Sequence, residues 1–155
     1  AYSTISHLGL IVLLLGLKSE LALVAAIFAR LGIRAGAPAD DSRFLIALET
    51  ALAQKTVEID RFFFDWRGGR RRGPSPADTA YAAEAFAPVR EALAGREAVP
   101  GALDHPYWSD EAPCSMHMGE VEAIWSRIDE ADDWSALHAK VAAVRRMGDA
   151  IRGGA

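Results

Sequence analysis

A cluster of arginines in a glycine-rich segment is the part of this sequence best suited to chemistry. Residues 61–73 contain five arginines and one acidic residue, Asp65, so the local net charge is +4 in a chain whose overall charge is −4. Guanidinium groups bind phosphate in a bidentate manner, and glycine lets backbone N–H groups approach an anion. The pattern predicts an anion site for a phosphate, a nucleotide or an acidic protein surface. Its candidate residues are Arg67, Arg70, Arg71 and Arg72.

The same segment has a simpler interpretation, which the sequence leaves open. Phe62, Phe63 and Trp66 fall on one face of a short helix that Gly68 and Gly69 end. Cations after the last turn of a helix complement the partial negative charge of its carbonyl groups. The arginines would then form a solvated loop that stabilises the helix end and binds no ligand.

A second group, His105, Cys114 and His117, has the residue types of a metal site. Cys114 and His117 have a Cys-x-x-His spacing that suits zinc, but a structural zinc site uses four ligands and only three lie close in sequence. We therefore assign no metal ligand and keep zinc at these three residues as an open alternative. The acidic neighbours Asp110 and Glu111 would not lower the pKa of Cys114, which argues against a nucleophilic thiol.

The sequence lacks the motifs of the common catalytic classes. It contains no G-x-x-x-x-G-K-[ST], G-x-G-x-x-G, H-E-x-x-H, C-x-x-C or G-x-S-x-G. We therefore assign no catalytic residue.

Composition and charge restrict the class of protein. At 155 residues, 51% hydrophobic and 25% charged, the chain is expected to form one folded domain. A net charge of −4 disfavours nucleic acid and anionic membranes as partners, and a single cysteine suits a reducing, cytoplasmic compartment. Apolar runs at 8–17 and 21–29 are separated by Lys18 and Glu20, which would fall inside any membrane span. We expect two packed core helices there instead of a transmembrane segment.

The elements that position these residues are predicted to be helices, because alanine and leucine dominate and period-two alternation is not sustained. We expect a compact all-α array of about six to eight helices in a single domain, 1–155. Four of the expected helices cover residues 6–15, 19–31, 60–66 and 88–95. A further helix starts at Asp41 or Ser42 and has Leu45, Leu48 and Leu52 on one face, and another starts at Ser75 and contains Tyr81 and Phe86. The last two start at Ser115 and at Asp132 or Asp133.

Two irregular segments interrupt the expected helices. The glycine- and proline-rich break at 68–76 is the one place where the domain could be subdivided. The segment 96–114 is a long loop containing Tyr107 and Trp108. Two aromatic residues in such a loop indicate that it is pinned to a neighbouring surface.

Apolar stripes predict the core faces of the last two helices, and the aromatic cluster at 62–66 is predicted to be core as well. Residues repeat at the spacing of one helix face, which is more typical of a buried surface than of a cofactor site. The two stripes are Val121, Ile124, Trp125 and Ile128, followed by Trp134, Leu137, Val141 and Val144.

Several of these segments together resemble the C-terminal part of the selenoprotein O (SelO) family, bacterial members in particular. The resemblance covers about residues 30 to 150 and rests on dispersed aromatic and loop positions, not on a catalytic signature. The segments that carry it are Leu31-Gly32-Ile33, the helix with Leu45, Leu48 and Leu52, Glu58-Ile59-Asp60-Arg61-Phe62-Phe63-Phe64-Asp65-Trp66-Arg67-Gly68-Gly69, Phe86-Ala87-Pro88-Val89-Arg90, His105-Pro106-Tyr107-Trp108, Pro113-Cys114-Ser115-Met116, Val121-Glu122-Ala123-Ile124-Trp125 and Asp132-Asp133-Trp134.

The resemblance implies a family with a protein-kinase-like fold that transfers AMP from ATP to protein hydroxyl groups, with Mg as the divalent metal. The nucleotide- and metal-binding residues of that family precede the matching segment, so none is carried over to this sequence. Asp65-Trp66-Arg67-Gly68 looks like a kinase metal motif only superficially, because it ends a helix. The chain ends Arg152-Gly153-Gly154-Ala155, without the C-terminal cysteine-type motif of some members.

The function implied by the resemblance is that of a non-catalytic C-terminal helical region of a SelO-like protein adenylyltransferase. The chain would be a fragment whose partner is the kinase-like catalytic domain of the same parent protein, and ATP and Mg would bind to that domain. The alternative is a free-standing helical interaction or dimerisation module, in which a second copy covers the apolar surface at 8–17. On either interpretation no cofactor is expected in this chain.

Overall fold

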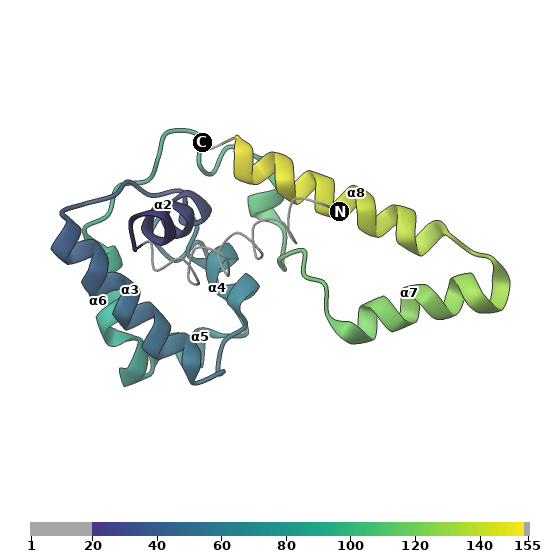
Figure 1. Ribbon diagram of the computed structural model, residues 1–155, viewed down its shortest axis with the longest axis horizontal. Coiled ribbons are helices and arrows are strands. Elements are labelled where there is room, and N and C mark those ends of the chain that lie inside the picture. The colour runs from purple at the N-terminus through teal and green to yellow at the C-terminus, as the bar shows by residue number, and fades with distance from the viewer. Residues whose placement is uncertain (1–19, 154–155) are drawn as a thin grey trace.

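The computed structural model describes residues 20–153, which form helices joined by loops (Figure 1). Seven α-helices and two short 3-10 helices follow one another in this part of the chain, and an antiparallel bridge joins Ile33 to Ala98. The expected all-α class is confirmed. In order, the elements are α2 (Glu20–Leu31), α3 (Pro38–Ala53), α4 (Ile59–Asp65), α5 (Asp78–Ala82), η1 (Glu84–Phe86), α6 (Ala87–Ala94), η2 (Pro106–Ser109), α7 (Met118–Ala131) and α8 (Ser135–Arg152).

Helices α2 to α6 surround the larger of two apolar cores. α3 packs against α2, η1 and α6, and α4 packs against α2. The Phe62 ring contacts the rings of Phe63, Phe86 and Trp66, with centroids 5.5, 6.3 and 6.4 Å away. Every side chain from 62 to 66 is buried, so the prediction that this cluster is core is confirmed.

α2 ends at a glycine, as the sequence predicts. Gly32 has a φ of 63°, the left-handed conformation that glycine adopts most readily. The N–H of Ile33 donates back to the Phe28 carbonyl at 3.1 Å. A Cβ at position 32 would lie 2.7 Å from Arg67 Nε and 2.8 Å from the Ala102 Cβ. Backbone conformation and close packing therefore both require glycine here.

α3 begins three residues before the earlier of its two predicted starts, Asp41. Pro38 lies in the first turn, where a missing N–H costs nothing. The Asp41 carboxylate accepts the Gly36 N–H at 3.1 Å and pairs with Arg96 at 2.6 Å, so this acid holds the preceding loop instead of marking the helix start. The predicted apolar face of the helix packs into the core and consists of Leu45, Leu48 and Leu52.

The helix predicted from Ser75 is divided into α5 and η1. Ser75 and Asp78 form a reciprocal cap: Ser75 Oγ accepts the Ala77 N–H at 3.2 Å, and Asp78 Oδ2 accepts the Ser75 N–H at 2.9 Å. α5 itself begins at Asp78 and carries the buried Tyr81. The next helix, α6, ends at Ala94 just before Gly95, as expected.

The loop at 96–114 is pinned to the body by its two aromatic residues, as predicted. Tyr107 and Trp108 lie in η2 and are buried against Phe64, with ring centroids 5.4 and 6.0 Å from its ring. Met147 of α8 belongs to the same second core. This core therefore joins α4, η2 and α8, which are far apart in the sequence.

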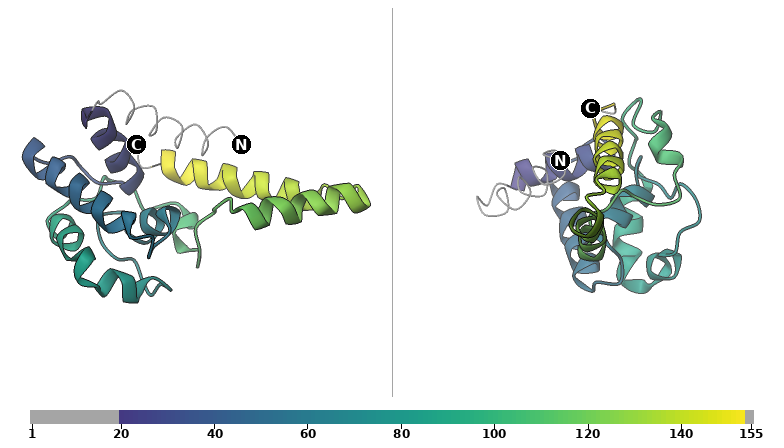
Figure 2. Two further views of the ribbon diagram at one scale, coloured as in Figure 1. Left: turned by 60° about the horizontal axis from the view of Figure 1, so that its bottom comes forward. Right: turned by 90° about the vertical axis from the view of Figure 1, so that its right-hand side faces the viewer.

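α7 and α8 form a helical hairpin that projects from the body (Figures 1 and 2). The prediction that a helix begins from Ser115 is wrong, because the Ser115 carbonyl binds Lys140 Nζ and α7 starts three residues later, at Met118. At the start of α8, Asp133 Oδ1 accepts the Ser135 N–H at 2.9 Å. α8 begins at Ser135, with Trp134 at the N-cap position and no side-chain cap there, so the predicted start from Asp132 or Asp133 is too early.

The apolar stripes of the hairpin are only partly buried, so their predicted assignment to the core is wrong for several residues. Val144 is buried, whereas Trp125 is 64% exposed and Trp134 is 43% exposed. No residue of α7 is buried. Among residues 20–153, α7 packs chiefly against α8, which leaves one side of each stripe without a covering element.

Two predictions lie outside the described residues, namely the helix at 6–15 and the contact of the surface 8–17 with a second copy. The subdivision at 68–76 stays a prediction. No helix within residues 20–153 combines the length and the apolar character needed to span a bilayer.

We expect Gly32→Ala to destabilise the protein by about 2 kcal/mol, because it places a side chain on a left-handed backbone and against the Arg67 guanidinium. Chemical denaturation followed by circular dichroism measures the change. Gly119→Ala in α7 is the matched control, since an added Cβ there has no neighbour within 4 Å and alanine favours a helix by up to about 1 kcal/mol. Equal stability of the two variants would contradict this packing.

Candidate functional site

Arg67, the first of the predicted anion-binding residues, is buried and binds carbonyl groups of its own chain. The residue is 0% exposed. Nη1 donates to the carbonyl oxygens of Ala29 and Arg30, both at 2.8 Å. Nε donates to the Ala102 carbonyl at 3.1 Å, and Nη2 donates to that of Ile151 at 3.4 Å. The guanidinium therefore stabilises the C-terminal ends of α2 and α8 and does not face solvent.

The environment of Arg67 accounts for its protonation state. The guanidinium faces the Trp108 ring, with Cζ 4.7 Å from the ring centroid, in the arrangement of a cation–π contact. Burial lowers the pKa of Arg67 to about 10, and the charge of Arg30 acts in the same direction. The side chain is still a cation at neutral pH, and the surrounding carbonyl dipoles compensate its charge.

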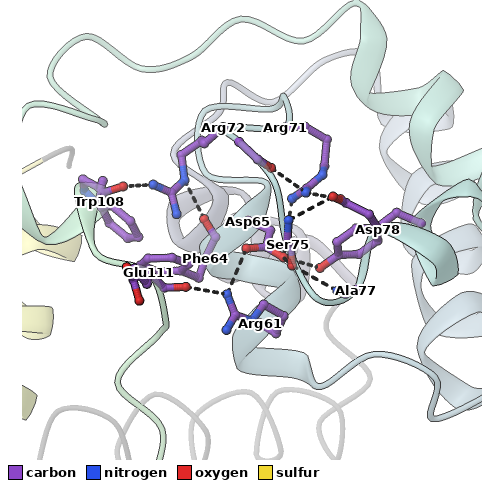
Figure 3. Close-up of polar contacts among 12 residues, drawn as sticks. Arg61, Phe64, Asp65, Arg71, Arg72, Ser75, Ala77, Asp78, Trp108 and Glu111 are labelled. Carbon is purple, nitrogen blue, oxygen red and sulfur yellow. Dashed lines mark hydrogen bonds and ion pairs between the residues drawn. The ribbon is translucent and has the colours of Figure 1, made fainter.

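Arg72 fastens the segment after α4 to two other elements (Figure 3). Its Nε donates to the Phe64 carbonyl at 2.7 Å, and its Nη1 donates to the Trp108 carbonyl. The guanidinium also lies over the Phe64 ring, with Cζ 4.2 Å from the centroid. Burial lowers the pKa of Arg72 from the ordinary arginine value. Like Arg67, Arg72 therefore donates its hydrogen bonds to carbonyl oxygens of the chain.

Asp65 is a buried acid around which the remaining polar contacts gather (Figure 3). Its carboxylate accepts the Ser75 hydroxyl at 2.5 Å and the Tyr81 hydroxyl at 3.0 Å, and lies 3.4 Å from Arg71 Nη1. Arg71 also donates to Asp78. Burial and the nearby Asp65 carboxylate raise the pKa of Tyr81, which keeps its hydroxyl protonated and able to donate.

The structure thus separates the four predicted anion-binding arginines. Arg70 is exposed, whereas the other three place their guanidinium groups against oxygen atoms of the chain. The groove beside the cluster, about 580 Å³ in volume, is also lined by Asp110 and Glu111. The donors of these three guanidinium groups are directed to oxygen atoms of the chain, which leaves fewer of them for an added anion. Anion binding stays a prediction, and Arg70 is the member of the set placed to take part in it.

The three candidate metal ligands have separate contacts. His105 Nδ1 accepts the Tyr107 N–H at 3.1 Å, and the Cys114 N–H donates to the Tyr107 hydroxyl oxygen at 2.9 Å. His117 Nδ1 lies 4.0 Å from Glu58 Oε2. Within the described range, no three His, Cys, Asp or Glu side chains gather where they could hold a metal ion. The histidines and the cysteine are thus not brought together as a ligand set.

Sequence reasoning missed the open face of the α7–α8 hairpin, which contains an apolar groove of about 460 Å³ between the two helices. The apolar spacing predicted a buried stripe and could not tell whether anything covers it. One signal was present in the sequence. Trp125 is preceded by Glu122 at three residues and followed by Asp129 at four, so acidic residues border it on its own helix face.

Comparison of the sequence and the structure with family models, curated proteins and solved structures gives no match.

We expect Arg67→Met to lower the free energy of unfolding by about 3 kcal/mol or more, because it leaves several buried carbonyl groups without a donor. Arg67→Lys should be intermediate, since an ammonium keeps the charge but lacks the planar fork of donors. Arg70→Met is the matched control at an exposed site and should change stability by no more than about 0.5 kcal/mol. Urea denaturation of the three variants measures these differences. Similar losses for Arg67→Met and Arg70→Met would argue against the buried role.

We expect the Cys114 thiol to react slowly at neutral pH, because burial raises its pKa above the ordinary value of 9.0. The rate of alkylation by iodoacetamide should still be rising at pH 9, and at pH 7.5 it should be lower than that of glutathione measured in parallel. Cys114→Ser supplies the blank. A titration midpoint near 7 would instead reveal a stabilised thiolate, as in reactive cysteines.

Proposed function

We propose that this chain is a non-catalytic helical region belonging to the C-terminal part of a SelO-like protein adenylyltransferase. The observation that supports this most directly is that three segments carrying the resemblance, 58–69, 105–108 and 113–116, contact one another. Trp108 lies against Phe64 and Arg67, and the Tyr107 hydroxyl binds the backbone of Cys114. The residues that carry the resemblance therefore make contacts that join separate segments of this fold.

The polar side chains of these segments are used for structure, which supports a scaffold role. Asp65 is satisfied by a hydroxyl network, and Arg67 and Arg72 are satisfied by carbonyl groups. On this proposal, ATP and Mg bind to a kinase-like domain of the same parent protein, and the present region supports or flanks that domain. The net charge of −4 and the single cysteine are compatible with a cytoplasmic location and with proteins, not nucleic acid, as partners.

We expect the isolated chain to transfer no AMP. The experiment incubates it with ATP labelled at the α-phosphate, Mg²⁺ and an acceptor protein, and measures label retained on protein. Label should stay at the level of a heat-denatured sample of the same chain, because the groups that would bind nucleotide belong to the absent domain. An adenylyltransferase of known activity, run in parallel, shows that the assay works.

ATP-dependent labelling that exceeds the denatured sample would overturn the proposal. A second test is independent of activity. The reading frame upstream of the codon for Ala1 should encode a kinase-like domain with nucleotide- and metal-binding residues, and an upstream region that encodes no such domain would count against the SelO assignment.

A second candidate function is a helical protein-interaction module, and one observation favours it. The α7–α8 hairpin projects from the body (Figures 1 and 2). An apolar groove lies along it, and Trp125 in that groove is 64% exposed. Exposed apolar patches bordered by polar residues are typical of contact surfaces. The two candidates are compatible, because a non-catalytic region can also bind a further protein.

A further inference from the structure

The open face of the α7–α8 hairpin is an apolar groove of about 460 Å³ that residues of both helices line. Trp125 and Trp134 are among its lining residues and are 64% and 43% exposed. The residues that form most of it are Val121, Ile124, Trp125, Leu137, Val141 and Val144.

The opposite side of the hairpin differs in character, because charged residues line its groove, among them Glu120, Lys140 and Arg146. Arg146 pairs there with Asp110 beside η2. Lys140 lines both grooves and directs its Nζ to Glu120 at 2.6 Å. Within residues 20–153, no element covers the apolar side. Exposing that apolar surface to water costs free energy in proportion to the exposed area.

The side chains that border the open face differ in type between the two helices: they are acidic on α7 and basic on α8, where Arg145 carries the charge when histidine is counted as neutral. On α7, Glu122 and Asp129 lie three residues before and four residues after Trp125. On α8, His138 and Arg145 lie three residues before and four residues after Val141. These four side chains are exposed, and within residues 20–153 none of them takes part in an ion pair.

The same asymmetry holds for the whole helices. α7 contains four acidic residues and one arginine, a net charge of −3. α8 contains three arginines, one lysine and one aspartate, a net charge of +3 with histidine counted as neutral. A surface that is acidic along one edge and basic along the other is complementary to itself after a two-fold rotation. Stacking α7 on α7 would instead place acid against acid.

We propose that a second copy of this chain covers the open face, with the two hairpins forming a four-helix bundle in which α7 of one copy lies against α8 of the other. The apolar stripes meet in the centre of the bundle, and the acidic edge of each hairpin faces the basic edge of its partner. The inference deepens the second proposed function and names its partner. It does not depend on whether the parent protein transfers AMP.

Sedimentation velocity of the full chain over a range of concentrations tests the proposal, and a reversible dimer is expected. The double variant Glu122→Arg with Asp129→Arg should weaken the dimer by about tenfold or more, because both edges become basic. Adding His138→Glu and Arg145→Glu to the same chain exchanges the two edges and should restore dimerisation. Ile46→Glu is the matched control, since Ile46 is an exposed apolar residue of α3 away from the hairpin.

Fluorescence quenching supplies the second measurement. In a Trp134→Phe protein, Trp66 and Trp108 are buried, so acrylamide quenching reports chiefly on Trp125. Quenching should fall as concentration rises and the dimer forms. Circular dichroism of each charge variant checks that the fold is retained.

Two results would overturn the inference. A monomer at all concentrations would do so, and shielding of Trp125 in that monomer would identify a segment of the same chain as the cover. A dimer that withstands the double charge reversal would place the contact elsewhere, for instance at 8–17. Neither result bears on the labelling assay, so the failure of this inference and the failure of the scaffold proposal can be told apart.

Discussion

The structure depends on one buried cation, the Arg67 guanidinium, which binds carbonyl groups at the C-terminal ends of α2 and α8. Arg67 binds the last carbonyl groups of α2 and reaches the Ile151 carbonyl near the end of α8, 84 residues away in the chain. Each helix end carries partial negative charge that a low-polarity interior cannot solvate. A single guanidinium satisfies both ends and stacks on Trp108, so the cost of burying its charge is offset by several contacts at once.

This constraint explains the composition around it. Gly32 is needed because the guanidinium passes within 2.8 Å of where a side chain would begin, and Gly68 donates its N–H to the Leu31 carbonyl at 2.7 Å. Nearby, Arg72 binds the Trp108 carbonyl of η2, and Asp65 accepts the hydroxyl of Tyr81 in α5. A glycine- and arginine-rich segment has the composition of a phosphate-binding loop, yet here its donors are directed inward to backbone carbonyls and a carboxylate. The local charge in the sequence therefore does not show whether these arginines face solvent or the interior.

Local features of the fold could be predicted, whereas features that arise from distant contacts could not. Gly32 and Gly95 correctly indicate the ends of α2 and α6, because a glycine directly after a helix is itself a local signal for its end. The partners of Arg67 are backbone carbonyls, which carry no residue-specific signal, so its burial could not be inferred from the sequence. The start of α3 was misjudged because Asp41 pairs with Arg96, 55 residues away.

The hairpin illustrates the same limit and shows why its open face has consequences for folding. An apolar stripe identifies a face that needs cover but not the element that supplies it. α7 has no buried residue, and short helices depend on tertiary packing for most of their stability. Any partner on the open face would add the burial that α7 lacks, so binding and the stability of this helix are thermodynamically linked. Arg67 binds the Ile151 carbonyl at the C-terminal end of α8, and this contact does not depend on a partner. The hairpin can therefore present a surface while the body remains folded.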